Sequence, residues 1–269
     1  MSARWARTRS YAVRAGAAVT GLTLLVACSG PASSGEGAAT TSADTTLTVF
    51  AAASLQTPFE AIGAAFEEAN PGTTVRFGFG GSSGLVAQLT EGAPADVLAT
   101  ANEATMTTAE SAGLLAGTPR PFATNVLQIA VPADNPRRVD ALADLADPAT
   151  KVVLCAPAVP CGAASLAVEK AAGIDITPVS EEQSVTDVLG KVRSGEADAG
   201  LVYVTDVRGA GDSVRGIDFP EAAKAVNTYP IATLKGSENA SFAIKFVAAV
   251  TSPDGQRVLR DAGFSPATP

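Results

Sequence analysis

The sequence alternates short apolar runs of β-forming residues with longer segments of helical periodicity, and this alternation constrains the fold more than any other feature. The β-type runs are residues 46–53, 73–79, 96–100, 122–131, 151–155, 199–204 and 226–234, and the helical patterns are residues 55–69, 85–90, 139–146, 163–172, 184–194, 242–251 and 253–262. Such alternation is typical of βαβ units and predicts an α/β fold with mostly parallel sheets.

Two of the β-type runs, 122–131 and 226–234, could pass between two lobes. They divide the chain into a discontinuous lobe one, residues 47–124 plus 233–269, and a continuous lobe two, residues 125–232. This division is an expectation from the periodicity alone.

The first 27 residues have the composition of an export signal. They carry four arginines and no acidic residue, followed by an apolar run that is too short to span a membrane comfortably. The run ends in Leu25-Val26-Ala27-Cys28, which resembles the lipobox of bacterial lipoproteins, where the cysteine is acylated. The alternative is an ordinary signal peptide followed by a spare cysteine. Residues 28–46, rich in Ser, Gly, Ala and Thr, are predicted to form a flexible tether.

Charge and residue usage exclude several classes of function. Without residues 1–27 the chain keeps 15 basic and 27 acidic residues, so the net charge changes from −8 to −12. This acidic balance argues against nucleic acid and anionic membrane surfaces as partners. The sequence contains no histidine, which removes Ser-His-Asp and Cys-His catalysis and histidine-ligated zinc. We therefore expect neither an enzyme nor a protein with a metal-cation site or a cofactor.

Four segments at the carboxyl ends of predicted strands, where open α/β sheets bind ligands, carry hydroxyl groups or begin helices. They are residues 51–55 with Ser54, residues 78–84 with Ser82 and Ser83, residues 155–162, and residues 183–185 together with the strand end at Tyr203. The structural alternatives are an N-cap for Ser54, a flexible turn for 78–84 and a core aromatic for Tyr203. As ligand groups these residues provide donors without Lys, Arg or His, which suits a fully deprotonated oxyanion.

Cys155 and Cys161 flank a loop that contains two prolines. In an oxidising compartment the two cysteines are expected to form a disulfide that shapes this loop. Free thiols, or a redox or metal site, are the alternatives. Five intervening residues do not match the Cys-x-x-Cys spacing of redox motifs, and two cysteines are too few for a zinc site.

Six segments, in order along the chain, form a recognisable combination. They are Thr48–Leu55 (TVFAAASL), Gly81-Ser82-Ser83, Gly92–Val97 (GAPADV), Pro160-Cys161-Gly162, Gly200–Tyr203 (GLVY) and Ala262-Gly263-Phe264. Together they resemble the corresponding segments of the molybdate-binding proteins of bacterial ABC importers. The resemblance implies a two-lobed, type II periplasmic-binding-protein fold that closes on molybdate or tungstate in the cleft between the lobes. It also implies donors from the side chain and backbone of Ser54 and Ser82, from the backbone N–H groups of Cys161 and Val185, and from the Tyr203 hydroxyl. Glycines at 80 and 81 leave open whether Ser82 or Ser83 makes the main contact.

The expected protein is thus a monomeric lipoprotein on the outer face of the cell membrane that binds molybdate, and tungstate with it, and passes the ion to the permease of an ABC importer. One alternative is a binder of another oxyanion such as sulfate, or of an organic solute. A secreted hydrolase or redox lipoprotein is a further alternative, disfavoured by the missing Gly-x-Ser-x-Gly motif and the cysteine spacing. The sequence does not exclude catalysis by a Ser-Lys pair.

Overall fold

The computed structural model describes residues 45–267. The predicted signal segment, the acylated Cys28 and the tether up to residue 44 lie outside the described residues. Thr45 and Thr46, the latter assigned to the tether, already belong to the first strand. Within residues 45–267 no helix has the length and apolar character needed to cross a membrane.

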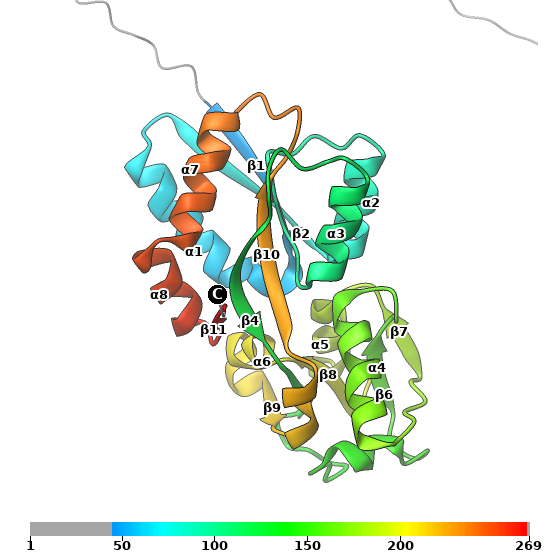
Figure 1. Ribbon diagram of the computed structural model, residues 1–269. Helices are drawn as coiled ribbons and strands as arrows, with labels where there is room; N and C mark the ends of the chain where they lie inside the picture. The colour runs from blue at the N-terminus through cyan, green and yellow to red at the C-terminus, as the bar shows by residue number, and fades with distance from the viewer. Residues whose placement is uncertain (1–44, 268–269) are drawn as a thin grey trace, which may run out of the picture. The chain divides into compact units, whose positions relative to one another are not determined.

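The first sheet has the strand order β11-β4-β10-β3-β1-β2. Its strands are β1 (Thr45–Ala52), β2 (Thr73–Gly80), β3 (Val97–Ala99), β4 (Arg120–Asn125), β10 (Asn227–Thr233) and β11 (Ser265–Pro266). On one side lie α1 (Gln56–Ala69), α7 (Ala240–Thr251) and α8 (Pro253–Asp261), and on the other α2 (Ser82–Thr90) and α3 (Glu103–Ser111) (Figure 1). Phe59, Phe66 and Phe246 make edge-to-face contacts in the core beneath α1 and α7.

The second sheet has the order β7-β6-β8-β5-β9. Its strands are β5 (Leu127–Pro132), β6 (Val152–Cys155), β7 (Ser180–Glu182), β8 (Ala199–Tyr203) and β9 (Val214–Ile217), and its helices are α4 (Pro160–Ala172), α5 (Val185–Arg193) and α6 (Val204–Ala210). A second buried cluster, which includes Leu127, Val168 and Leu201, fills this lobe. The predicted α/β architecture with two sheets is confirmed.

The expectation of mostly parallel sheets is wrong, because both sheets are mixed. In the first sheet β1 runs parallel to β2 and β3, whereas β10 is antiparallel to β3 and β4. In the second sheet β6 is parallel to β7 and β8, and β5 is antiparallel to β8 and β9. The antiparallel pairs involve the segments that pass between the sheets, which join their sheet without a βαβ crossover and can therefore run in the opposite direction.

The chain passes from the first sheet to the second at Val126. The predicted strand 122–131 is divided there into β4 and β5, and the Val126 N–H donates to Oδ1 of Asn125 at 3.0 Å instead of to a neighbouring strand. The chain returns to the first sheet in β10, which pairs there from Asn227 onward. The predicted lobe boundary at residues 232/233 therefore lies near the end of β10. Both sheets belong to one compact unit.

A few local elements differ from the sequence-based expectation. Only residues 142–146 of the predicted helix 139–146 are helical, as the 3-10 helix η2 (Leu142–Ala146). Helices α3 and α6 and the short strands β7 and β9 were not expected. The remaining 3-10 helices are η1 (Ala53–Leu55), η3 (Gly211–Ser213) and η4 (Pro220–Lys224). Helix α3 has a weak apolar pattern and depends on its N-cap, since Oδ1 of Asn102 accepts from the Thr105 N–H at 2.9 Å.

Candidate functional site

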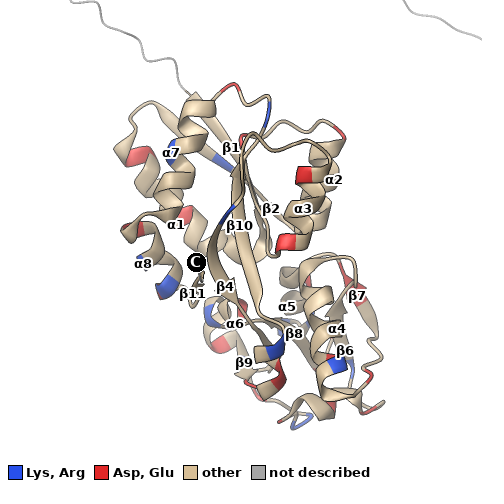
Figure 2. Cartoon of the chain, viewed as in Figure 1, with Lys and Arg blue, Asp and Glu red and all other residues tan. Residues whose placement is uncertain are grey.

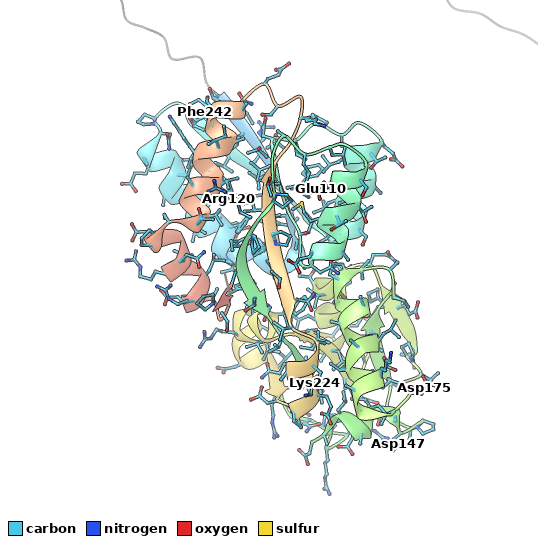
Figure 3. All side chains as sticks on the ribbon, viewed as in Figure 1. Glu110, Arg120, Asp147, Asp175, Lys224 and Phe242 are labelled. Atoms are coloured by element: carbon cyan, nitrogen blue, oxygen red, sulfur yellow. A yellow bond between two sulfur atoms is a disulfide. The ribbon has the colours of Figure 1, made fainter. Side chains whose placement is uncertain are left out.

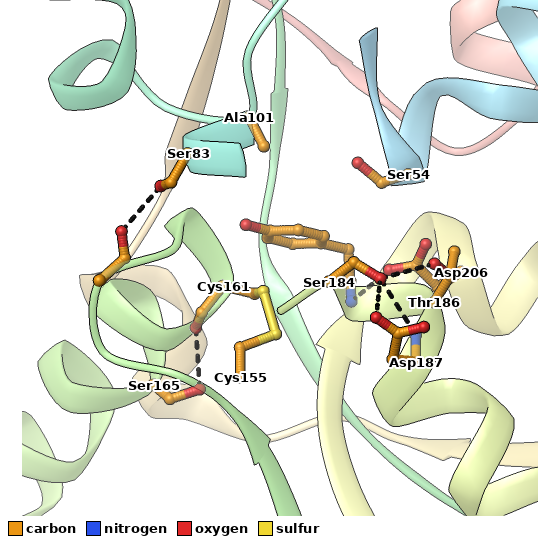
Figure 4. Close-up of a disulfide and its surroundings, with 12 residues drawn as sticks. Ser54, Ser83, Ala101, Cys155, Cys161, Ser165, Ser184, Thr186, Asp187 and Asp206 are labelled. Carbon is orange, nitrogen blue, oxygen red and sulfur yellow. Dashed lines mark hydrogen bonds between the residues drawn. A yellow bond between two sulfur atoms is a disulfide. The ribbon is translucent and has the colours of Figure 1, made fainter. Parts of the chain in front are cut away.

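Four helix starts meet at one small cavity between the two sheets. The first lobe contributes η1, which leads into α1, and the start of α2; the second lobe contributes the starts of α4 and α5. The cavity is lined by Ala52, Ala53, Ser54, Gly80, Gly81, Ser82, Ala101, Val159, Pro160, Cys161, Ser184, Val185 and Tyr203. The structure thus brings together the five donors that the resemblance implies, whereas Ser83, the alternative to Ser82, does not line the cavity. The five are Ser54, Ser82, Cys161, Val185 and Tyr203. Figure 4 shows Ser54 and Ala101 on one side and Cys161 and Ser184 on the other.

The electrostatics of this cavity come from the backbone. None of the residues that line it is charged. First-turn N–H groups of a helix lack intrahelical acceptors, and the helix dipole adds partial positive charge at the same end, so converging helix starts favour an anion. Charged residues are spread over the lobes (Figure 2), and Asp147, Asp175 and Lys224 lie at the end of the second lobe away from the first (Figure 3).

The cavity itself is small, at about 20 Å³. This volume suits about one water molecule. Larger grooves lie elsewhere, including one of about 410 Å³ beside Thr46, Asp96 and Lys235, but it does not gather helix starts. A second groove of about 410 Å³ shares Ser54 with the cavity and contains Asp206.

Four residues that line the cavity carry hydroxyl groups: Ser54, Ser82, Ser184 and Tyr203. Three of these hydroxyls, those of Ser54, Ser82 and Tyr203, have a polar partner behind the cavity wall. Ser82 is 1% exposed, and its Oγ accepts from the Ala101 N–H at 3.0 Å. Oγ of Ser54 lies 3.0 Å from Oη of Tyr229, where either group can donate. Oη of Tyr203 accepts from Nδ2 of Asn227 at 3.0 Å. Serine and tyrosine hydroxyls have one proton each, so an accepted bond leaves that proton available for the cavity.

The disulfide predicted between Cys155 and Cys161 is present, with an S–S distance of 2.07 Å. It closes the loop between β6 and α4, so that Cys161 occupies the second position of α4. The next residue, Gly162, packs so tightly on this loop that a Cβ there would overlap the Ala156 carbonyl oxygen. The disulfide and the glycine therefore fix the loop against the start of α4, where Pro160 and Cys161 line the cavity.

Val185 begins α5, and the residue before it caps that helix. The Ser184 hydroxyl donates to Oδ2 of Asp187 at 2.6 Å and accepts from the Asp187 N–H at 3.3 Å. This hydroxyl is thus committed to its own helix. The groups that α5 can offer to a ligand are the N–H groups of its first turn.

The two adjacent serines at the start of α2 have different partners. Ser82 lines the cavity, whereas the Ser83 hydroxyl donates at 2.8 Å to the carbonyl oxygen of Ala158 in the second lobe (Figure 4). Next to them, a Cβ on Gly81 would overlap the carbonyl oxygen of Gln183, which also belongs to the second lobe. The lobes are therefore in direct contact at the mouth of the site.

Sequence reasoning missed three buried polar residues around the cavity: Asn227, Tyr229 and Asp206. The first two lie on β10, two residues apart and hence on the same face of the strand. The available signal was the run of three polar residues, Asn227-Thr228-Tyr229, at the start of a strand that is apolar further on, but this run does not indicate which groups the side chains contact. Asp206 lies in the first turn of α6, and its Oδ2 accepts from the Tyr203 N–H at 2.8 Å.

Burial controls the protonation of these groups. Desolvation raises the pKa of Tyr203 well above its ordinary value and raises the pKa of Tyr229 as well, so both hydroxyls stay protonated at physiological pH. Desolvation also raises the pKa of the Asp206 carboxyl from 3.8 to about 7, although the bond from the Tyr203 N–H opposes that shift. No group of three or more potential metal-ligating side chains comes together within residues 45–267.

The family model for bacterial extracellular solute-binding proteins matches residues 47–265. The chain belongs to this family. Molybdate-binding protein ModA of Mycobacterium tuberculosis H37Rv is 49% identical to this solute-binding protein over 241 residues, which cover 90% of this chain and 92% of the relative.

Solved structures of the same fold include two anion-binding proteins. The periplasmic molybdate-binding protein of Azotobacter vinelandii superposes with a TM-score of 0.72 at 21% identity and covers 82% of this chain and 100% of its own. The sulfate-binding protein SubI of M. tuberculosis H37Rv superposes with a TM-score of 0.73 at 22% identity, covering 84% of this chain and 88% of its own. These two likenesses show that the solute-binding protein shares their fold, with its cavity between the two lobes.

Proposed function

We propose that this solute-binding protein captures molybdate, and tungstate with it, outside the cytoplasm and delivers it to the membrane permease of an ABC importer. The observation that carries the proposal is the convergence of four helix starts and the hydroxyls of Ser54, Ser82 and Tyr203 on one cavity without a charged side chain. A fully deprotonated tetrahedral oxyanion has acceptors only, so a set of neutral donors in a water-poor site can satisfy it. The 49% identity to a molybdate-binding protein supports molybdate as the ion.

Each lobe supplies part of the donor set. Ser54 and Ser82 donate from the first lobe through their hydroxyls and backbone; Cys161 and Val185 donate backbone N–H groups from the second, and Tyr203 adds its hydroxyl. Because the cavity measures about 20 Å³, an oxyanion enters only when the lobes separate, and the lobes then close on the bound ion. Sulfate accepts the same hydrogen bonds as molybdate, so the volume of the cavity after the lobes close selects between sulfate and molybdate.

Delivery to a permease requires the protein to stay near the membrane. The Leu25–Cys28 lipobox supports cleavage before Cys28 and acylation of its sulfur, with residues 29–44 as the tether of a monomeric carrier. Replacing Cys28 with serine is expected to release the protein from the membrane fraction without changing its affinity for molybdate. If the Cys28→Ser protein stayed in the membrane fraction, the predicted lipid anchor would be wrong, and the proposed ligand would not be affected.

Titration calorimetry with molybdate, tungstate, sulfate and phosphate tests the proposed ligand. We expect molybdate and tungstate to bind at one site per chain, sulfate to bind more weakly, and phosphate, which carries a proton at neutral pH, to give no heat. Absence of heat with both molybdate and tungstate would overturn the proposal. Tighter binding of sulfate than of molybdate would assign the protein to the alternative oxyanion.

A further inference from the structure

The side chain of Asn227 links the two lobes directly behind the cavity. It is 6% exposed and lies at the start of β10, where the chain returns from the second lobe to the first. Its Nδ2 donates to the carbonyl oxygen of Ala101 at 2.8 Å and to Oη of Tyr203 at 3.0 Å. Ala101 belongs to the first lobe, and Tyr203 ends β8 in the second.

These two bonds determine which way the Asn227 amide faces. A carbonyl oxygen can only accept, so the NH₂ group, and not the amide oxygen, must face Ala101. Both protons of the NH₂ group are then used, one for the Ala101 carbonyl and one for the Tyr203 hydroxyl. An NH₂ group cannot accept a hydrogen bond, so at this contact Oη of Tyr203 is the acceptor.

The Tyr203 hydroxyl has only one proton, and that proton cannot point at Asn227. Tyr203 is 1% exposed and lines the cavity, and its hydroxyl also hydrogen-bonds with that of Tyr229. The proton can therefore turn either to the Tyr229 hydroxyl or to a bound anion, and the charged anion is the stronger acceptor. Without the amide behind it, the hydroxyl could rotate and present a lone pair to the anion, which would repel it. Ser82 has the same arrangement, with the Ala101 N–H donating to its Oγ.

We propose that Asn227 is a positioning residue that fixes the Tyr203 hydroxyl as a hydrogen-bond donor toward the bound oxyanion. It touches no ligand atom in this scheme and acts through Tyr203 alone. The inference rests on the proposed oxyanion-binding function of the cavity. Two titratable groups act on Tyr203 electrostatically, Tyr229 and Asp206, and the Tyr229 hydroxyl also hydrogen-bonds with it.

A double-mutant cycle separates positioning from a purely structural role. The dissociation constant for molybdate, or for whichever oxyanion of the calorimetric panel binds, is measured for the unmodified protein, Asn227→Leu, Tyr203→Phe and the double variant, all at one pH. If Asn227 acts through Tyr203, Asn227→Leu weakens binding about tenfold or more in the tyrosine background and less than about twofold in the phenylalanine background. Equal losses in the two backgrounds would overturn the proposal and assign the effect to the lost Ala101 bond.

Two further variants serve as a control and as a substitute for Asn227→Leu. Thr228→Val makes a polar-to-apolar change at the next residue of β10, whose side chain points to the opposite face, and is expected to leave affinity unchanged. Asn227→Asp keeps the size of the side chain and serves where Asn227→Leu does not fold. Its added charge weakens binding in both backgrounds and cancels in the cycle, whereas its carboxylate accepts the Tyr203 proton only in the tyrosine background.

Failure of the unmodified protein to bind any of the four oxyanions would count against the proposed function, and additive losses in a protein that binds would count against this inference alone.

Discussion

At the residue scale, Ser54 gives a direct test of one donor in the proposed anion site. Its side chain is 8% exposed, lines the cavity and contacts Tyr229 behind it. Ser54→Ala removes a donor to a charged acceptor and is expected to weaken molybdate binding by roughly 1.5–3 kcal/mol. Calorimetry of the variant checks this, and an unchanged affinity would remove Ser54 from the donor set.

Asp206 predicts a pH dependence of stability whose sign follows from its burial. The pKa of its carboxyl is about 7 in the folded protein against 3.8 ordinarily, so between these values the folded state binds more protons than the unfolded state. Stability therefore falls as the pH rises through this range, by at most about 4 kcal/mol. Asp206→Asn keeps an oxygen for the Tyr203 N–H and should remove this loss.

Thermal unfolding between pH 4 and pH 8 measures the Asp206 effect. The unmodified protein should lose stability toward the upper end relative to Asp206→Asn. Asp140→Asn, a change at an exposed carboxyl, should follow the unmodified protein. Parallel pH profiles for the unmodified protein and Asp206→Asn would show that Asp206 is ionised throughout.

The site residues differ in how far sequence could predict them. Ser54, Ser82 and Val185 lie at helix starts that follow strands or short connections, a local pattern that is visible along the chain. Asn227 and Tyr229 contact groups more than 20 residues away, Tyr229 within the first lobe and Asn227 across the two lobes. Nothing local to β10 predicts such partners, because they depend on how the sheets are joined.

At the scale of elements, the start of α2 limits how closely the lobes can approach. Gly81 lies so near the Gln183 carbonyl that any Cβ would overlap it. Gly81→Ala is expected to hold the lobes apart and weaken molybdate binding by roughly 1–3 kcal/mol, the usual range for overpacking. Gly84→Ala is the matched control on the same helix, because its Cβ would meet no atom within 4 Å.

Small-angle scattering with and without molybdate provides the second readout for this pair. The Gly84→Ala protein should contract on binding like the unmodified protein, and the Gly81→Ala protein should contract less. An equal affinity and an equal contraction for the two variants would show that the Gly81–Gln183 contact does not limit closure.

The elements themselves were predictable where periodicity was strong and unpredictable where distant partners decide. Helix α1, with Phe59, Ile62 and Phe66 on one face, followed from its spacing. Helix α3 did not, since its core contacts are few and its start depends on one capping bond. The direction of the strands was also not predicted. Strand β10 is antiparallel to its neighbours β3 and β4, and the sequence does not show that it lies between them.

At the scale of the whole molecule, the net charge is negative, whereas the helix starts and hydroxyl protons at the cavity carry partial positive charge. The chain without residues 1–27 carries a net charge of −12, yet the cavity between its lobes presents helix starts and hydroxyl protons. In the proposed function both lobes must contribute before the donor set is complete, which links capture of the ion to closure. The contacts of Ser83 with Ala158 and of Asn227 with Tyr203 hold the lobes in that arrangement.

Elemental analysis of the protein, purified from bacterial cells grown with molybdate and without chelators, tests this capture most directly. We predict about one molybdenum atom per chain, retained through gel filtration and lost from the combined Ser54→Ala and Tyr203→Phe protein. Protein that retains sulfur as sulfate, or no oxyanion at all, while molybdate is present in the medium would contradict the proposed function.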